Sequence, residues 1–475
     1  MSKRYFIHTF GCQMNEHDSA RMGEELGRAG WSPAPAVEAA DLVLVNTCAI
    51  REKAEDKLFS ALGRYRLLKA QRGTRIGVSG CVAQQEKDRL LARAPYVDFV
   101  LGPDQIARVG ELAERGSGAV ETDWVPTEDY LFPQADPETS RGRATAFVIA
   151  MKGCDNVCSF CVVPYTRGRE VSRPYAEIVR EVAALAAVGV REVTLIGQNV
   201  NSYAGGCSFA ALLRRIDAVP GVARIRFTTS HPMDLSEELV ACFAPRASGG
   251  LRALMPHFHL PVQHGSDEVL RRMRRNYSVA EYERRVGQLR ALAPGLALTS
   301  DVICGFLGET DADHALNLAL LRRVPFDNLF SFIYSRRPHT TADKMLERNE
   351  AAARPEGAWA EVPRDLALRR LAEVQALQRE RTLSSHRALV DAEVEVLVER
   401  AETEPGVTGE RFGRSRENWT THFTGPSRVG DVVRVRVLRA SPAALAGEET
   451  SLVDPGLRGN PSAAHPRRPL AIVRA

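Results

Sequence analysis

Three cysteines on one short stretch carry the clearest chemical signal in this sequence. Cys154, Cys158 and Cys161 are spaced Cys-x3-Cys-x2-Cys directly after a predicted strand and a Lys-Gly turn. Thiolates hold iron–sulfur clusters, and three on one loop can bind three irons of a [4Fe–4S] cube while the fourth iron stays open to a small molecule. A ferredoxin needs a fourth cysteine in such a run, and zinc favours paired Cys-x2-Cys units, so both fit poorly. This central triplet therefore predicts a cluster with one open iron.

Three further cysteines, Cys12, Cys48 and Cys81, are far apart in the sequence but occur in the same local setting. Each follows the carboxyl end of a predicted strand, and in an open parallel sheet these ends meet at the edge where such folds bind ligands. This N-terminal triplet predicts a second three-cysteine site, although position alone also allows three unrelated loop cysteines. The remaining cysteines have no partners at ligand spacing and are expected to be structural: Cys207, Cys242 and Cys304.

Two series of alternating strands and helices must position these triplets. The first predicts an open parallel α/β domain at 1–120, followed by a polar, proline-containing connector at 121–142. Its strands are expected near 4–9, 41–46, 75–79 and 97–101, and its helices near 17–29, 53–70, 83–93 and 104–114.

The second series, at 143–363, predicts a partial barrel of six βα units. Its strands are expected near 145–151, 191–197, 223–229, 257–261, 297–303 and 327–334. Ligands of βα barrels bind at the carboxyl ends of the strands, which makes Gln198, Asn199 and Gln263 candidate cofactor contacts. The rest of the chain is expected to form a linking helix at 364–385, a small β-barrel domain at 386–450 and a disordered, proline-rich tail at 451–475.

Composition excludes several classes of protein. The 475 residues are 44% hydrophobic and 26% charged, which is ordinary for a globular protein of two or three domains. The apolar stretches are too short to span a bilayer and the start lacks a signal-peptide core, so we expect a cytoplasmic protein without membrane contact. Nine cysteines, an odd number, indicate metal or redox chemistry before a disulfide framework. The net charge of +4 neither requires nor excludes a nucleic-acid partner.

With both triplets considered, the sequence from about residue 3 to 449 resembles the methylthiotransferase family of radical S-adenosylmethionine enzymes. The resemblance is carried by Phe-Gly-Cys-Gln-Met-Asn at 10–15, Asn-Thr-Cys-Ala-Ile-Arg-Glu-Lys at 46–53, Gly-Cys-Val-Ala-Gln at 80–84, and 153–173, which contains Cys-Val-Val-Pro-Tyr-Thr-Arg-Gly-Arg-Glu. Gly-Gln-Asn-Val-Asn-Ser-Tyr at 197–203 is similar to the branch called MiaB, which modifies N6-isopentenyladenosine at tRNA position 37. Sister enzymes that act on threonylcarbamoyl-adenosine or on a ribosomal protein differ at this stretch.

The resemblance implies a radical-SAM barrel, two [4Fe–4S] clusters and S-adenosylmethionine as cofactors, and a sulfur-group transferase activity on tRNA. It assigns reductive cleavage of S-adenosylmethionine to the central triplet, giving a deoxyadenosyl radical that removes hydrogen from C2 of the adenine. It assigns the supply of sulfur to the N-terminal triplet. An electron donor such as flavodoxin or ferredoxin is implied as a partner. The oligomeric state is not determined by the sequence, and a monomer is the working expectation.

The C-terminal module resembles the small RNA-binding β-domain called TRAM. Between 411 and 439 it has seven arginines interleaved with Phe412, Trp419 and Phe423. These side chains can bind phosphates and stack on bases, or they can equally serve the fold of the domain itself. A second basic run is expected to be an ordinary solvated helix face: Arg271, Arg272, Arg274 and Arg275.

The sequence differs from the family pattern at three positions, and it leaves two other functions open. His264, Leu307 and His339 stand where the family usually has Ser, Pro and Gly, which leaves the detailed cofactor and substrate contacts uncertain. A non-catalytic iron–sulfur RNA-binding protein would explain the basic β-module but leaves the open-iron loop without a purpose. A sister methylthiotransferase is the other alternative.

Overall fold

The N-terminal part folds around a parallel sheet with strand order β2-β1-β3-β4-β5-β6, and β20 pairs in parallel with β1. In the computed structural model, residues 3–49, 52–133, 135–352, 359–404, 406–456 and 472–474 are described. Strand β3 is apolar on both faces because helices cover both: Val43 and Val45 belong to the same core as α2, and Leu42 and Leu44 to the same core as α1. This is the open α/β domain that the sequence predicts.

The four expected strands are present with similar bounds, whereas β2, β6 and β20 are not among the expected strands and α1 begins before the expected residue 17. The helix expected at 83–93 is split in two at Lys87, which has a left-handed φ of 48°. The strands are β1 (Arg4–Phe10), β2 (Ser32–Pro33), β3 (Leu42–Thr47), β4 (Arg75–Gly80), β5 (Phe99–Leu101), β6 (Ala119–Glu121) and β20 (Ile472–Arg474). The helices are α1 (Gln13–Arg28), η1 (Val37–Ala39), α2 (Glu52–Arg72), α3 (Cys81–Glu86), α4 (Asp88–Arg93), η2 (Pro103–Arg108) and α5 (Val109–Glu114).

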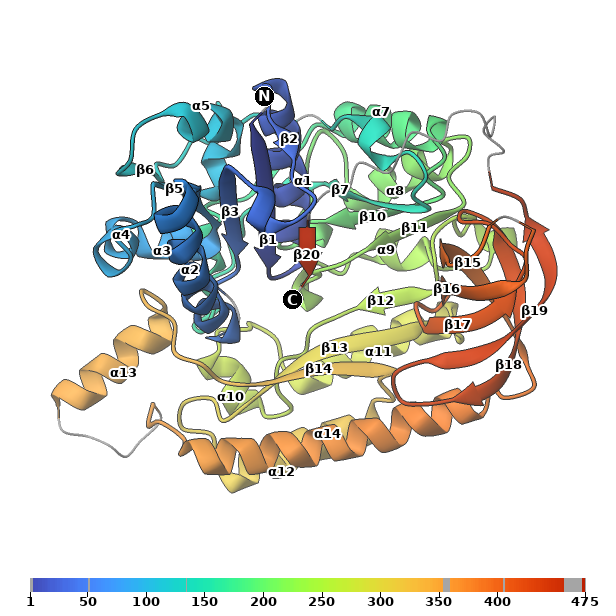
Figure 1. Cartoon of the computed structure of the whole chain (residues 1–475). Helices are drawn as coiled ribbons and strands as arrows, with labels where there is room; N and C mark the ends of the chain where they lie inside the picture. Colours follow the sequence, from blue (N-terminus) through green and yellow to red (C-terminus); the bar gives the residue numbers. More distant parts are fainter. Residues whose placement is uncertain are drawn as a thin grey trace.

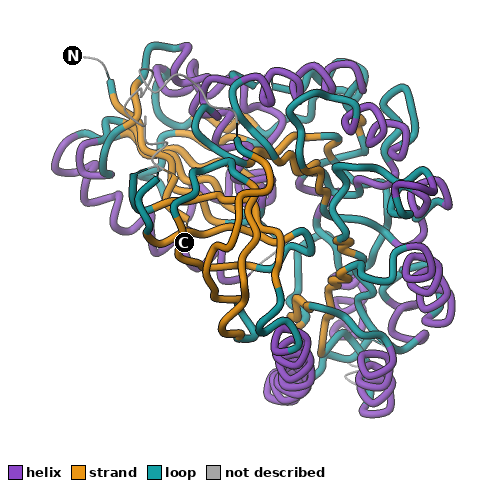
Figure 2. The backbone as a smooth tube through the Cα atoms, turned by 90° about the vertical axis from the view of Figure 1, so that its right-hand side faces the viewer, coloured by secondary structure: helices purple, strands orange, loops and turns teal. Residues whose placement is uncertain are grey.

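The central part forms six parallel strands in two three-stranded sheets, β7-β10-β11 and β12-β13-β14, joined by a parallel bridge between Ile225 and Leu254. Figure 1 shows these strands between the N-terminal sheet and the C-terminal barrel, and Figure 2 shows helices around them. Reciprocal capping boxes at Ser278 and Thr310 begin two of the covering helices, α11 and α12. The open six-unit βα barrel is therefore confirmed.

The bounds of the central elements follow in chain order. The strands are β7 (Thr145–Ile149), β8 (Met151–Lys152), β9 (Val171–Ser172), β10 (Glu192–Ile196), β11 (Arg224–Phe227), β12 (His257–His259), β13 (Ala297–Cys304) and β14 (Asn328–Ile333). The helices are η3 (Pro137–Ser140), α6 (Val163–Thr166), α7 (Tyr175–Ala187), η4 (Val200–Ser202), α8 (Phe209–Asp217), η5 (Pro232–Asp234), α9 (Glu237–Ala241), η6 (Arg246–Ser248), α10 (Asp267–Arg272), α11 (Val279–Leu292), α12 (Asp311–Arg323) and α13 (Thr341–Ala351).

A long helix, α14 (Arg364–Arg387), packs along β13 and β14 and leads into a closed five-stranded barrel of order β15-β16-β17-β19-β18. In the barrel strand β18, buried valines alternate with exposed arginines, as expected for a barrel with one core. The strands are β15 (Glu393–Ala401), β16 (Gly409–Ser415), β17 (Thr420–Gly425), β18 (Val432–Ala440) and β19 (Leu445–Asp454). Strand β19 ends four residues past the expected domain boundary. Of the tail expected to be disordered, 457–471 and 475 lie outside the described residues, and β20 is a short strand.

The C-terminal barrel docks on the amino-terminal edge of the central strands. Arg224 and Arg226, on β11, are both buried, and their guanidinium groups donate to the carbonyl oxygens of Arg414 (2.8 Å), Ser415 (2.6 Å) and Arg416 (2.9 Å). This edge lies opposite the one that carries the central triplet. Within the described part of the chain, no helix is long and apolar enough to cross a membrane.

Candidate functional site at the interface of two domains

The N-terminal triplet lies where three neighbouring strands of one sheet end. Cys12 precedes α1, Cys48 follows β3 and Cys81 is the first residue of α3, directly after β4. A hydrogen bond from the Cys48 thiol stabilises the Cys12 thiolate, and although burial opposes it, the pKa of Cys12 is lowered to about 6. The structure therefore brings the predicted residues together.

A buried amide network holds the three loops in register. The side-chain amide of Asn15 donates to Asn46 Oδ1 at 2.9 Å, and Asn46 Nδ2 donates back to the Asn15 carbonyl oxygen at 2.8 Å. Asn15 Oδ1 also accepts a hydrogen bond from Cys12 Sγ at 3.2 Å. Gly80 has φ = 92°, and a Cβ there would lie 2.4 Å from Asn46 Oδ1. Both asparagines were part of the matched sequence stretches, but sequence reasoning gave them no role.

The central triplet lies on a loop between β8 and α6 that is fixed from both sides. Gly153 has φ = 74°, and a Cβ there would fall 1.9 Å from the carbonyl oxygen of Arg169. The amide of Cys154 donates to the Gly168 carbonyl at 3.2 Å, and the amide of Cys161 donates to the Cys158 carbonyl at 3.1 Å. From the other side, Ser159 donates through its amide and hydroxyl to carbonyls at 273 (3.0 Å) and 272 (2.7 Å). These hydrogen bonds and the close backbone approach at Gly153 fix the conformation of the loop independently of a cofactor.

Each triplet has one buried arginine that donates to a cysteine sulfur. Arg167 Nε donates to Cys81 Sγ at 3.2 Å, and Arg275 Nη1 donates to Cys158 Sγ at 3.3 Å. The prediction that 271–275 is a solvated basic face is wrong for two of its four arginines. Arg275 points to the central triplet, and Arg272 is buried and donates to the Leu307 carbonyl at 2.6 Å. Arg272 is the last residue of α10 and is buried on that helix, whereas Arg275 follows the helix between two residues with left-handed φ values, so residue type alone could not reveal either direction.

Burial disfavours the ionised form of three of the cluster cysteines. Burial raises the pKa of Cys154 to about 11 and that of Cys161 to about 12, and it also raises the pKa of Cys81. Free thiols of this kind stay protonated at neutral pH, so iron must displace their protons when it binds. Among the described residues, no three His, Cys, Asp or Glu side chains are placed to share a single metal ion. A four-iron cube does not require this because each cysteine binds its own iron.

The three candidate cofactor contacts differ in their surroundings. Gln198 Oε1 accepts a hydrogen bond from the Gly153 amide, so this side chain steadies the central loop. Asn199 Nδ2 donates to Asp234 Oδ2 at 2.8 Å, whereas its Oδ1 is buried without a hydrogen-bond partner among the described residues. Gln263 is buried with φ = 72° and forms a parallel bridge with Val302 through its backbone. All three lie beyond the carboxyl ends of central strands.

The three residues that depart from the family pattern lie in different surroundings. His264 is fully buried, accepts a hydrogen bond from the Ser266 amide at 3.0 Å through Nδ1, and places Nε2 3.8 Å from Glu309 Oε1. Leu307 fills a small apolar cluster with Phe306. His339 has φ = 70°, a conformation that favours the glycine usual at this position.

The arginines of the C-terminal barrel divide into structural and exposed ones. Arg411 is buried and donates to four acceptors within the barrel, including the Ser427 carbonyl at 2.7 Å, and Phe423 lies in the barrel core. Arg414 pairs with Glu399 at 2.7 Å, and Arg436 pairs with Glu448. The side chains that remain exposed without an ion pair among the described residues are those of Arg416, Arg428, Arg434 and Arg439.

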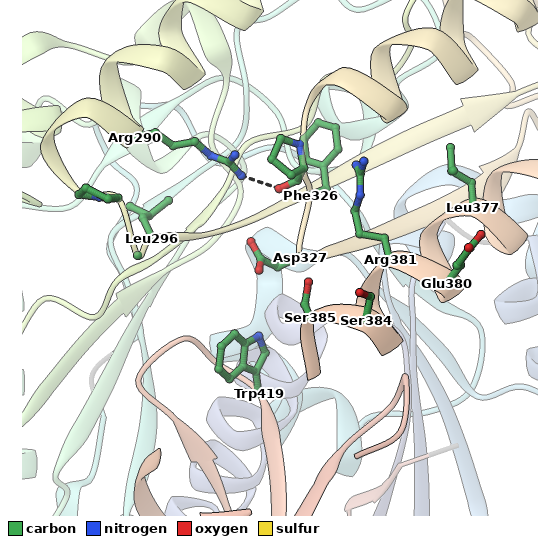
Figure 3. A pocket seen from close by; sticks show the side chains of 13 residues that line it. Arg290, Leu296, Phe326, Asp327, Leu377, Glu380, Arg381, Ser384, Ser385 and Trp419 are labelled. Carbon is green, nitrogen blue, oxygen red and sulfur yellow. Dashed lines mark hydrogen bonds between the residues drawn. The ribbon is translucent and has the colours of Figure 1, made fainter. Parts of the chain in front are cut away.

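A cavity of about 660 Å³ lies at the opposite edge of the central strands, between α11, α14 and the C-terminal barrel. Figure 3 shows Trp419 of the barrel facing Asp327 and the end of α14 at Ser385, with Arg290 donating to the Pro325 carbonyl above them. The cavity contains no cysteine and lies away from both triplets. It is therefore separate from the candidate site.

Two family models match separate parts of this chain. Residues 4–102 match the uncharacterized protein family UPF0004, and residues 148–319 match the radical SAM superfamily. The tRNA-2-methylthio-N(6)-dimethylallyladenosine synthase of Anaeromyxobacter dehalogenans (strain 2CP-C) is 59% identical over 450 residues, which cover 94% of each chain. The protein of the same name from Myxococcus xanthus (strain DK1622) is 54% identical over 457 residues, which cover 95% of each chain.

The solved structures similar to this chain support the fold. The radical S-adenosylmethionine methyltransferase TsrM from Kitasatospora setae aligns with a TM-score of 0.53 at 16% identity, over 74% of this chain and 77% of that chain. The cobalamin-dependent S-adenosylmethionine radical enzyme OxsB aligns with a TM-score of 0.50 at 13% identity, over 74% of this chain and 56% of that chain.

Proposed function

Because the chain belongs to the family of tRNA-2-methylthio-N(6)-dimethylallyladenosine synthases, we propose that it converts N6-isopentenyladenosine at tRNA position 37 to 2-methylthio-N6-isopentenyladenosine. It is a radical S-adenosylmethionine transferase that uses [4Fe–4S] clusters and S-adenosylmethionine. We assign one cluster to Cys12, Cys48 and Cys81 and the other, which binds S-adenosylmethionine, to Cys154, Cys158 and Cys161.

One observation carries this assignment: the two triplets face a single interface between the N-terminal and central domains. Val162, next to Cys161, lies in the same apolar core as Cys81. On the other side, Cys12 packs against a cluster that contains Ile149 and Ile196, the last residues of β7 and β10. Both sites therefore belong to the carboxyl-terminal edge of the central strands, where βα barrels act on their ligands.

The cofactors, when bound, supply the radical and the sulfur. A radical is needed because an aromatic C–H has no acidic proton that side chains could remove by ordinary base catalysis. The residues of this chain provide burial, fixed thiols and a small number of polar contacts. Asn199 Oδ1, which has no hydrogen-bond partner among the described residues, is the best candidate for a contact with S-adenosylmethionine, because a buried acceptor without a donor is costly until a ligand supplies one. Gln198 would act indirectly, through the Gly153 amide. Gln263 is kept as a third candidate because it lies at the same edge.

We propose that tRNA is held by the C-terminal barrel as well as by the cluster edge. Arg416, Arg428, Arg434 and Arg439 expose cationic side chains that can neutralise phosphates. The barrel docks at the edge opposite the clusters, so it would bind the stem side of the substrate and not the modified base itself. A monomer in the cytoplasm that takes electrons from a donor such as flavodoxin or ferredoxin completes the proposal.

The test is mass spectrometry of tRNA nucleosides from a deletion strain complemented with the wild-type gene or with a Cys158→Ala variant. We expect 2-methylthio-N6-isopentenyladenosine only with the wild type, and accumulation of N6-isopentenyladenosine otherwise. Loss of a methylthio derivative of threonylcarbamoyl-adenosine instead would establish the sister activity. Unchanged nucleosides in all strains would favour a non-catalytic RNA-binding protein.

A further inference from the structure

Three hydrogen bonds fix the position of the Arg275 guanidinium. Nε donates to the Tyr277 hydroxyl oxygen at 2.9 Å and Nη2 donates to the Pro261 carbonyl at 3.1 Å, which leaves Nη1 aimed at Cys158 Sγ at 3.3 Å. The side chain is only 5% exposed. Arg274 and Asn276 on either side take left-handed φ values of 56° and 55°, which cost free energy in residues other than glycine. The backbone is therefore strained on both sides of the residue whose guanidinium is directed inward.

Within the described part of the chain, no carboxylate balances the charge of Arg275. Among the residues that the structure describes, no Asp or Glu oxygen lies within 4.0 Å of its guanidinium. A buried unpaired cation is costly, and proteins retain one where an anion binds beside it. Because Nη1 donates to Cys158 Sγ, the anion that it would face is a cluster bound through that sulfur.

Arg167 makes the corresponding contact with the other triplet in a different electrostatic setting. Its Nε donates to Cys81 Sγ at 3.2 Å, but its Nη2 also lies 2.7 Å from Asp18 Oδ2, and both side chains are buried. The Asp18 carboxylate cancels most of the charge that Arg167 would project onto the N-terminal triplet. The chain thus contains one compensated and one uncompensated guanidinium in matched positions.

We propose that Arg275 sets the reduction potential of the S-adenosylmethionine-binding cluster, through its hydrogen bond to Cys158 and its uncompensated positive charge. Reduction adds one electron, and therefore one negative charge, to a buried group that this cation faces. A cation and a hydrogen bond to a cluster sulfur stabilise the reduced form and raise its potential. The inference rests on the proposed function, since it assumes that the central triplet binds that cluster.

The experiment compares Arg275→Met, which removes the charge at similar length, with Arg275→Lys, which keeps it. The matched control is the double variant Arg167→Met/Asp18→Asn, which removes the neutral pair at the other triplet. The full-length protein with both clusters is poised with dithionite at a series of potentials. The electron paramagnetic resonance signal that changes on addition of S-adenosylmethionine identifies the cluster of interest. Iron content and thermal unfolding check each variant.

We expect Arg275→Met to lower the midpoint potential of this cluster by at least the ~59 mV that corresponds to a tenfold change in a one-electron equilibrium. The Lys variant and the control should shift it by much less. An unshifted midpoint in a fully loaded Met variant overturns the inference. If the Met variant loses iron, the Lys variant is measured in its place. A midpoint potential of the Lys variant close to the wild-type value supports a charge effect, and a shift of ~59 mV or more contradicts it. A wild-type protein without any signal responsive to S-adenosylmethionine would instead refute the proposed function.

Discussion

Arg167 of the central domain reaches into the N-terminal domain, where its Nε donates to the sulfur of Cys81 across 3.2 Å. The same guanidinium pairs with Asp18 at 2.7 Å, on the helix that begins directly after Cys12. One side chain therefore connects the central barrel to two of the three loops or helices that carry the N-terminal triplet. Docking of the two domains and the geometry of this site are physically linked through it.

An Arg167→Met variant should lose stability at this interface by about 3–5 kcal/mol, because it leaves the buried Asp18 carboxylate without its cation. Arg167→Met/Asp18→Asn should recover a large part of the loss, since no uncompensated charge remains. Chemical unfolding of the apo protein, compared among the three chains, measures both effects. Equal stability of the single and double variants would show that the ion pair does not join the domains.

The Asp98 carboxylate gives the N-terminal domain a defined dependence on pH. Burial alone would raise its pKa, but Lys69, the Ser117 hydroxyl (2.6 Å) and the Ile76 amide (2.8 Å) together hold the pKa below its usual value. A lowered folded-state pKa stabilises the fold above the unfolded pKa of roughly 3.9, and this stabilisation is lost as pH falls through the folded value.

We therefore expect Asp98→Asn to cost about 1.5–3 kcal/mol at pH 7 and to reduce the loss of stability below pH ~4. Unfolding by urea at pH 7, 5 and 3.5 measures this difference. A constant difference between the two chains at every pH would contradict the assigned role of the carboxylate.

Gly153→Ala should disrupt the central loop, because a Cβ there would lie 1.9 Å from the Arg169 carbonyl oxygen, in addition to the strain of φ = 74°. Gly142→Ala is the matched control, since Gly142 has φ = 79° and open space around the same position. The control should cost about 1 kcal/mol. The Gly153 variant should also lose about half of the bound iron after reconstitution. Iron contents that are equal in the two variants would show that close approach of the backbone at Gly153 is not required.

Replacement of Arg416, Arg428, Arg434 and Arg439 together by Gln should weaken tRNA binding and flatten its salt dependence, by up to ~0.7–0.9 in log–log slope for each phosphate that is no longer neutralised. A control in which exposed Arg72 and Arg246 are replaced should leave the slope unchanged. Filter binding between 50 and 300 mM salt provides the measurement. If the quadruple variant keeps the salt dependence of the wild type, these four arginines do not contact phosphates and belong to an ordinary solvated surface.

The sequence predicts the layout of this fold because the relevant signals are local. Continuous apolar runs such as Leu42–Val45 define strands, and a cysteine after each strand end must lie at one sheet edge. The directions of buried polar side chains are not local properties. Arg275 contacts Cys158, 117 residues away, and Asn46 contacts Asn15, 31 residues away, so neither role can be predicted from residue type or period. The docking edge of the C-terminal barrel, set by Arg224 and Arg226, depends in the same way on distant contacts.

The central claim is that the two triplets divide the work, and it is tested most directly by measuring two products in one anaerobic reaction. 5′-Deoxyadenosine and 2-methylthio-N6-isopentenyladenosine are quantified together for the wild type, Cys48→Ala and Cys158→Ala, after iron content and folding have been checked. Cys48→Ala should keep part of its 5′-deoxyadenosine formation and make no methylthio product, whereas Cys158→Ala should make neither. Formation of the methylthio product by Cys48→Ala at the wild-type rate would contradict the assignment of sulfur chemistry to the N-terminal triplet.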